Sequence, residues 1–245
     1  MLAKEIWLVL ALSLGASAVS ALISFTGVLT SHHPLSSQTT VIVGSRAPGR
    51  PWLDLAWQIF AVVTALVPVA LAAHLLARGG ESLRTLGFDL RGGLRDLVRG
   101  TALAACVGGV GLGFYLVAHA TGINLAVDPS QLPDTWWRVP VLVAVAAQNA
   151  VLEEVIVLGY LTHRLEQLGW STRRSTAASA LLRGSYHLYQ GVGGFLSNVV
   201  MGVLFCHLYR RWGRVMPLVV AHTLIDIGAF VGATYLIGKV GWLPH

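Results

Sequence analysis

The chain has 245 residues, of which 55% are hydrophobic and only 11% are charged. Soluble domains carry about 25% charged residues, so this composition leaves too little polar surface to cover a water-exposed globule. The net charge of +6 is compatible with nucleic-acid binding, but the basic residues lie between apolar runs, which is typical of membrane proteins. The composition therefore indicates a membrane protein with no nucleic-acid partner.

Apolar runs long enough to cross a bilayer, about 20 residues each, recur along the chain. The first run continues well beyond Ala16-Ser17-Ala18, a possible cleavage site, so a retained helix is favoured over a signal peptide. The third is rich in glycine, which lets helices approach closely. The predicted helices are 6–30, 55–77, 100–120, 139–161, 175–190, 192–208 and 215–237. We expect an all-α fold: one polytopic transmembrane bundle over residues 1–245, with about seven (six to eight) membrane helices.

Lys and Arg are unevenly distributed between the two sides of this predicted bundle. Twelve of the 17 fall at the N-terminus and in the loops after the second, fourth and sixth helices, and five fall on the opposite side. Because basic loops stay in the cytoplasm, the N-terminus is expected to be cytoplasmic. The sequence thus predicts a multi-pass protein of the cell membrane, with the lipid bilayer as its surroundings.

Five polar residues in the C-terminal spans are candidates for a functional site: Glu153, Glu154, His187, His222 and Asp226. A carboxylate at the centre of a membrane helix costs about 2.5–3.5 kcal/mol, so each needs a partner or water. Their depths in the predicted helices, roughly 10 to 18 Å from the cytoplasmic ends, place them in one layer of the cytoplasmic half. His222 and Asp226 are four residues apart and share a helix face, so the carboxylate can orient the ring.

Two glutamates and two histidines in a wet pocket suit hydrolysis by either of two routes. In a metal-free route, a Glu helped by a His takes a proton from water, and the second His donates to the oxyanion. In a metal route, Glu153, His187 and His222 would hold zinc, although the H-E-x-x-H pattern is absent. Intramembrane Glu, His and Asp also line ion pathways in transporters or pair helices structurally. The residues alone leave these alternatives open.

Three short motifs on separate predicted helices resemble, in the same order, those of the CAAX protease and bacteriocin-processing family, also called the Abi or type II CAAX prenyl endopeptidase family. They are Glu-Glu-Val-Ile-Val-Leu-Gly-Tyr from Glu153 to Tyr160, Arg-Gly-Ser-Tyr-His ending at His187, and His-Thr-Leu-Ile-Asp starting at His222. The resemblance covers roughly residues 140–230. Two positions depart from the family pattern, because Leu158 replaces an Arg and Arg183 stands where Phe is frequent. Arg183 can pair with a carboxylate or snorkel to the interface.

The resemblance implies an intramembrane endopeptidase with a catalytic core at 140–230, acting on a membrane peptide or a lipidated protein. By position, Glu153 would activate water with His187, and Glu154 would support the site. His222, held by Asp226, would serve the oxyanion. The family's glutamate-based mechanism implies no cofactor, with zinc as the alternative from its older description as a metalloprotease. A non-proteolytic membrane protein, acting in immunity, as a scaffold or as an ion-coupled transporter, is the alternative function.

Overall fold

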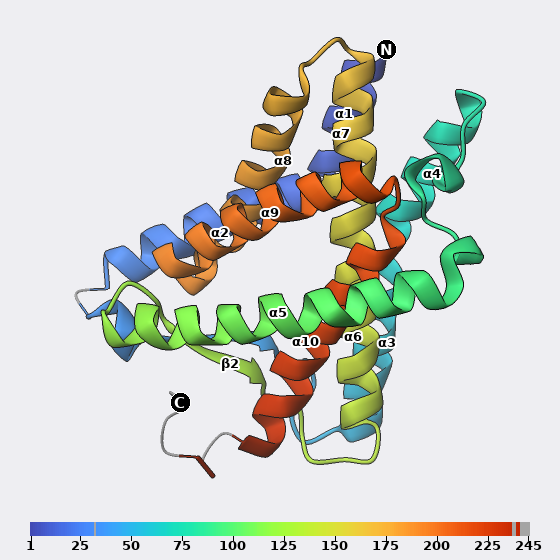
Figure 1. Ribbon diagram of the computed structural model, residues 1–245. Helices are drawn as coiled ribbons and strands as arrows, with labels where there is room; N and C mark the ends of the chain where they lie inside the picture. The colour runs from blue at the N-terminus through green and yellow to red at the C-terminus, as the bar shows by residue number, and fades with distance from the viewer. Residues whose placement is uncertain (32, 237–238, 241–245) are drawn as a thin grey trace.

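The computed structural model describes residues 1–31, 33–236 and 239–240. Figure 1 shows an almost wholly helical molecule, so the predicted all-α class is confirmed. The α-helices of the described part are α1 (Leu2–Ala11), α2 (Leu14–Leu29), α3 (Pro51–Ala65), α4 (Val67–Arg78), α5 (Gly93–Ala120), α6 (Arg138–Glu153), α7 (Leu161–Gln167), α8 (Thr172–Tyr186), α9 (Val192–Trp212) and α10 (Met216–Leu236). They are joined by a π-helix, η4 (Glu154–Tyr160), by the short 3-10 helices η1 (Leu35–Ser37), η2 (Leu83–Leu86), η3 (Leu90–Gly92) and η5 (Leu188–Gln190), and by strands β1 (Thr39–Val43) and β2 (Ala126–Ser130).

Five helical segments of the described chain are long and apolar enough to cross a membrane. They are Pro51–Arg78, Leu90–Ala120, Arg138–Gln167, Val192–Trp212 and Met216–Leu236. A sixth span results if the bent pair α1 and α2 is counted as one. The chain is therefore a multi-pass membrane protein with five or six spans, so only the count of six falls within the predicted range of six to eight.

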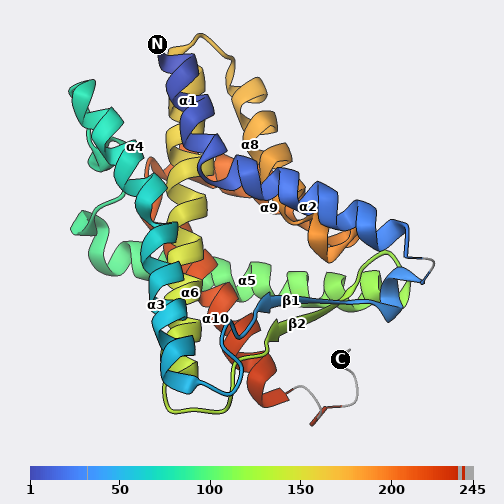
Figure 2. The ribbon, with the colours of Figure 1, turned by 180° about the vertical axis from the view of Figure 1, so that it is seen from behind.

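The first predicted helix, 6–30, is broken rather than straight. α1 and α2 meet at an angle of 49°, and Ser13 at the break has non-helical backbone angles. The Ser13 hydroxyl donates to the Val9 carbonyl at 2.6 Å, so it satisfies one of the acceptors at the end of α1. The bend sends α2 away from α1 toward the strands, as Figure 2 shows from behind.

The fifth predicted span, 175–190, is a helix, but it does not meet the length and apolarity of a membrane crossing. α8 has 15 residues, begins in the polar run Thr-Arg-Arg-Ser-Thr and ends at Tyr186. After it the chain turns through η5 and reaches α9 at Gly191, whose φ of 108° lies in the left-handed region that favours glycine. α8 instead packs between α2 and α9, where its polar face is covered by protein.

The column formed by α6, η4 and α7 is the centre of the fold. Of its apolar window 67% is buried, against 6% for the Leu90–Ala120 segment. Figures 1 and 2 show α3 and α4 beside this column and α10 crossing it. Because other helices surround it, polar side chains on the column face protein and not lipid, and it is the natural support for a site.

Two features lie outside the predicted helices. β1 and β2 form a parallel two-stranded sheet, with Thr39 opposite Ala126, inside segments expected to be loops. At the other end, ion pairs join α7 to the α4–α5 connection (Arg164–Glu81 at 2.8 Å), α9 to α7 (Arg210–Glu166 at 2.6 Å) and the turn after α9 to the same α4–α5 connection (Arg214–Asp89 at 2.9 Å). The basic loops therefore gather at one end of the molecule.

Candidate active site

The two glutamates lie where the central column changes from α-helix to π-helix. Glu153 ends α6 and Glu154 begins η4, all of whose residues are buried. The widened turn is supported from α8, since the Ser179 hydroxyl donates to the Val157 carbonyl at 2.7 Å. π-helical turns are rare and frequently occur at functional sites, because they turn side chains out of the regular helical register.

Arg183 of α8 is the cation that balances both carboxylates. Its Nη2 donates to Glu154 Oε1 at 2.6 Å, and its Nη1 lies 3.7 Å from Glu153 Oε2. The guanidinium also lies over the Phe205 ring, 5.5 Å from its centroid, and only 1% of the side chain is exposed. Of the two expectations for Arg183, pairing with a carboxylate is the one found.

Glu154 is also the nearest partner of His222. The distance from His222 Nδ1 to Glu154 Oε1 is 2.7 Å, whereas Nε2 lies 3.6 Å from Asp226 Oδ1. The spacing of four residues on α10 does bring His222 and Asp226 together, but the shorter contact comes from a different helix. Each ring nitrogen of His222 therefore faces one carboxylate, but only the contact with Glu154 is short enough for a hydrogen bond.

Glu153 is held more loosely than Glu154. Its Oε2 accepts a 2.8 Å hydrogen bond from the Tyr186 hydroxyl, and 10% of its side chain is exposed, against none of the Glu154 side chain. His187 lies within electrostatic range of Glu153. Glu153 is thus the more accessible of the two glutamates.

His187 directly follows α8 and is oriented by backbone and aromatic neighbours. Its Nδ1 lies 3.0 Å from the Arg183 carbonyl. Its ring lies 4.8 Å from that of Tyr186 and stacks at 6.4 Å on that of Tyr189. In the described part of the chain, no hydrogen bond joins His187 to Glu153, so these two groups interact through space or through a bound water.

The sequence places these side chains through the spacing of α8. Ser175, Ser179, Arg183 and Tyr186 are buried along one face of that helix, as residues four and three apart must be. Two glycines at the contact with α9 allow the close approach. A Cβ at Gly184 would lie 2.5 Å from Val199 Cγ2, and one at Gly202 would lie 2.9 Å from the Ala180 Cα.

The structure thus brings all five candidate residues, Glu153, Glu154, His187, His222 and Asp226, into one cluster, and it adds two side chains to them. Tyr186 was not expected as a site residue, and Arg183 was expected to pair with at most one carboxylate. Both lie on the α8 face that already carries Ser175 and Ser179, so the spacing of polar residues within an otherwise apolar region was the available signal.

The arrangement does not offer a zinc ligand set. Among the described residues, no group of three or more His, Cys, Asp and Glu side chains is arranged to hold a metal ion. Of the alternative ligand set Glu153, His187 and His222, His222 Nδ1 is directed instead at Glu154 Oε1, an oxygen that is also paired with the Arg183 guanidinium.

Comparison with known families agrees with the motifs. Residues 135–228 match the family model described as type II CAAX prenyl endopeptidase Rce1-like. The matched segment contains the three motifs and every residue of the cluster, so the resemblance inferred from them is confirmed. Comparisons with curated proteins and with solved structures found no match.

Proposed function

We propose that this multi-pass membrane protein, with its Rce1-like segment, is an intramembrane endopeptidase in which Glu153 activates the attacking water. The observation that carries the proposal is the contrast between the two glutamates. Glu154 is fully enclosed and engaged by Arg183 and His222, whereas Glu153 has one hydrogen-bond donor and an exposed edge. A general base needs a free lone pair within reach of water, and Glu153 meets that need.

In the proposed reaction, Glu153 takes a proton from water while the water oxygen bonds to the scissile carbonyl carbon. His187 lies beside this carboxylate and helps to orient the water. His222, protonated on both ring nitrogens, gives its Nδ1–H to Glu154 and donates its Nε2–H to the oxyanion, since the 3.6 Å to Asp226 is too long for a hydrogen bond. The proton on Glu153 then passes to the leaving amide nitrogen as the C–N bond breaks.

Arg183 and Glu154 support this chemistry without touching the substrate. Arg183 supplies the charge that lets two adjacent carboxylates stay buried together, which is otherwise strongly unfavourable. Glu154, which is held in place by Arg183, in turn orients the His222 ring through its contact with Nδ1. The pair thereby aims a donor at the position of the oxyanion, as preorganised electrostatic stabilisation requires.

The proposal extends to orientation, substrate and cofactor. The N-terminus and the end of the molecule that holds the ion pairs of Arg164, Arg210 and Arg214 would face the cytoplasm of a cell-membrane protein, as the charge distribution favours. Family likeness favours a membrane-embedded substrate, either a membrane peptide or a lipidated protein. No cofactor is invoked, since the cluster supplies a base and a donor.

The test is cleavage of a membrane-peptide library by the purified protein in liposomes, with ion flux measured on the same vesicles. We expect defined peptide products, no coupled flux, and turnover that survives thorough chelation. Coupled flux without cleavage would favour a transporter. Turnover that is lost on removing one bound zinc and regained on its return would favour the metalloprotease alternative.

A further inference from the structure

A pocket of about 420 Å³ lies between α2 and β1, next to the proposed active site. Its volume falls in the range of ligand sites. Tyr186, whose hydroxyl donates to Glu153, forms part of its wall, and Tyr189, which stacks on His187, forms another part. The pocket is therefore one side chain away from the carboxylate that we propose as the base.

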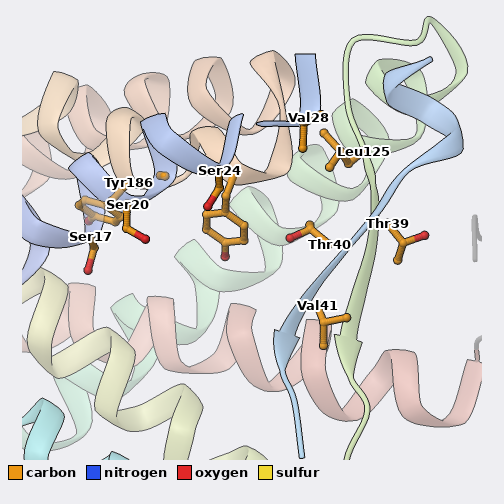
Figure 3. Close-up of a pocket in the computed structure, with 11 residues that line it drawn as sticks. Ser17, Ser20, Ser24, Val28, Thr39, Thr40, Val41, Leu125 and Tyr186 are labelled. Atoms are coloured by element: carbon orange, nitrogen blue, oxygen red, sulfur yellow. The ribbon is translucent and has the colours of Figure 1, made fainter. Parts of the chain in front are cut away.

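The α2 wall carries a polar stripe that an apolar helix does not need for lipid contact. Ser17, Ser20 and Ser24 recur at helical spacing on one face and all line the pocket. Figure 3 shows these serines projecting from α2, with Thr40 of β1 pointing toward the same space. Hydroxyl groups are both donors and acceptors, so this wall suits a ligand rich in N–H and C=O groups.

The opposite wall is the edge of a strand. β1 pairs with β2 on one side, and in the described part of the chain the sheet has only these two strands. Thr39, Thr40 and Val41 of β1 line the pocket. Such an edge presents backbone groups that can pair with another extended chain.

An extended peptide is the ligand whose backbone groups could form hydrogen bonds with both the α2 serines and the β1 edge. Within a membrane, each backbone N–H or C=O without a partner costs several kcal/mol, so a segment that is unwound for cleavage must find partners in the protein. Lipid chains have no such groups to satisfy and gain nothing from serines. We propose that this pocket binds the substrate as an extended segment that pairs with β1 and contacts the α2 serines. This inference rests on the proposed function and adds the subsite that presents the peptide to Glu153.

Disulfide trapping tests the subsite without relying on cleavage. Ser20→Cys and, as the matched control, Thr26→Cys are made in the Cys106→Ala protein, since Cys206 is buried. Thr26 is exposed on the same helix, its hydroxyl donates to the Leu22 carbonyl, and it does not line the pocket. The probes are membrane peptides of about 20 apolar residues, each carrying one cysteine at a scanned position.

We expect disulfides with Ser20→Cys at alternate peptide positions, because side chains of an extended chain alternate, and only background with Thr26→Cys. A spacing of three to four residues would indicate a bound helix and would overturn the proposal. Equal trapping at both positions, or trapping at neither, would also overturn it.

A cleavage assay distinguishes failure of the subsite from failure of the proposed peptidase function. The pair Ser20→Ala and Ser24→Ala should lower kcat/KM about tenfold, the effect of one or two lost hydrogen bonds, whereas Thr26→Val should not. Unchanged kcat/KM in the paired serine variant would refute the proposed subsite but would not affect the proposed peptidase activity. Disulfide trapping at alternate peptide positions by a protein that cleaves no peptide would support the subsite and refute the proposed peptidase activity.

Discussion

Arg183 Nη2 lies 2.6 Å from Glu154 Oε1, and both side chains are almost completely enclosed. This ion pair joins α8 to the π-helical turn of the central column and fixes the oxygen against which His222 is oriented. The geometry of the site therefore depends on a pair that is enclosed by protein.

Arg183→Met should destabilise the protein by about 3–5 kcal/mol, because breaking a buried pair leaves an uncompensated charge. Removing both charges in Arg183→Met with Glu154→Met should recover much of that loss, since apolar groups of similar size can replace a buried pair. Thermal unfolding in detergent measures both variants. A paired variant no more stable than Arg183→Met would contradict the role given to this contact.

His222 should depend more on Glu154 than on Asp226. Glu154→Leu removes the acceptor at 2.7 Å and should lower kcat/KM by roughly a hundred- to a thousandfold, the effect of losing one oxyanion donor. Asp226→Asn keeps an oxygen that can face Nε2 and should retain much of the activity. Comparable losses in the two variants, each measured well below its own unfolding temperature, would show that Asp226 has a role of its own in the chemistry.

The topology can be read from cysteine accessibility in sealed cells. Single cysteines at the exposed Arg84, Arg173 and Arg211 should resist a membrane-impermeant thiol reagent added outside, whereas cysteines at Ala47 and Asp134 should react. The Cys106→Ala background removes the exposed native thiol. Labelling of the cysteines at Arg84, Arg173 and Arg211 from outside would show that the orientation is the opposite of the one proposed.

The ion pairs at the end of the molecule that contains Arg214 should make the stability of the protein depend on pH. The hydrogen bond from Arg214 holds the pKa of Asp89 below its ordinary value of 3.8. A carboxyl whose pKa is lowered on folding stabilises the protein above the unfolded pKa of about 3.9, and this contribution is lost as the pH falls through the folded value. Asp89→Asn should therefore flatten the fall in unfolding temperature below about pH 4. Asp134→Asn, at a side chain that is 99% exposed, serves as the control, and an equal flattening there would contradict the assignment.

Much of the site could be predicted from the sequence, because burying a charge in a membrane is so costly that charged residues within apolar runs indicate a functional site. Glu153, His222 and Asp226 stand out against apolar neighbours, and the four-residue spacing gave the contact within α10. The contact from His222 to Glu154 crosses between helices, and no local spacing encodes it. Arg183 could be assigned as a pairing residue only once α8 was in place.

The fold was predictable at the level of class and less so in its details. Hydropathy detects α3 with α4, α5, α6, α9 and α10 because each is a long apolar run. The bend at Ser13, the π-helical turn from Glu154 and the parallel pairing of β1 with β2 arise from contacts between distant segments. α8 was predicted as a span because Ser175 begins a run of small residues, but the polar side chains on that helix are covered by other helices and not by lipid.

Glu153→Gln is the most informative single substitution, because Glu153 is the proposed base. Gln keeps the shape of the side chain and can still accept from Tyr186, but it has almost no basicity. We measure kcat/KM on a cleaved membrane peptide together with the unfolding temperature of each protein. The expected result is a loss of at least about a hundredfold, in line with general-base catalysis, at a nearly unchanged unfolding temperature. A folded Glu153→Gln protein that cleaves the peptide at the wild-type rate would contradict the account.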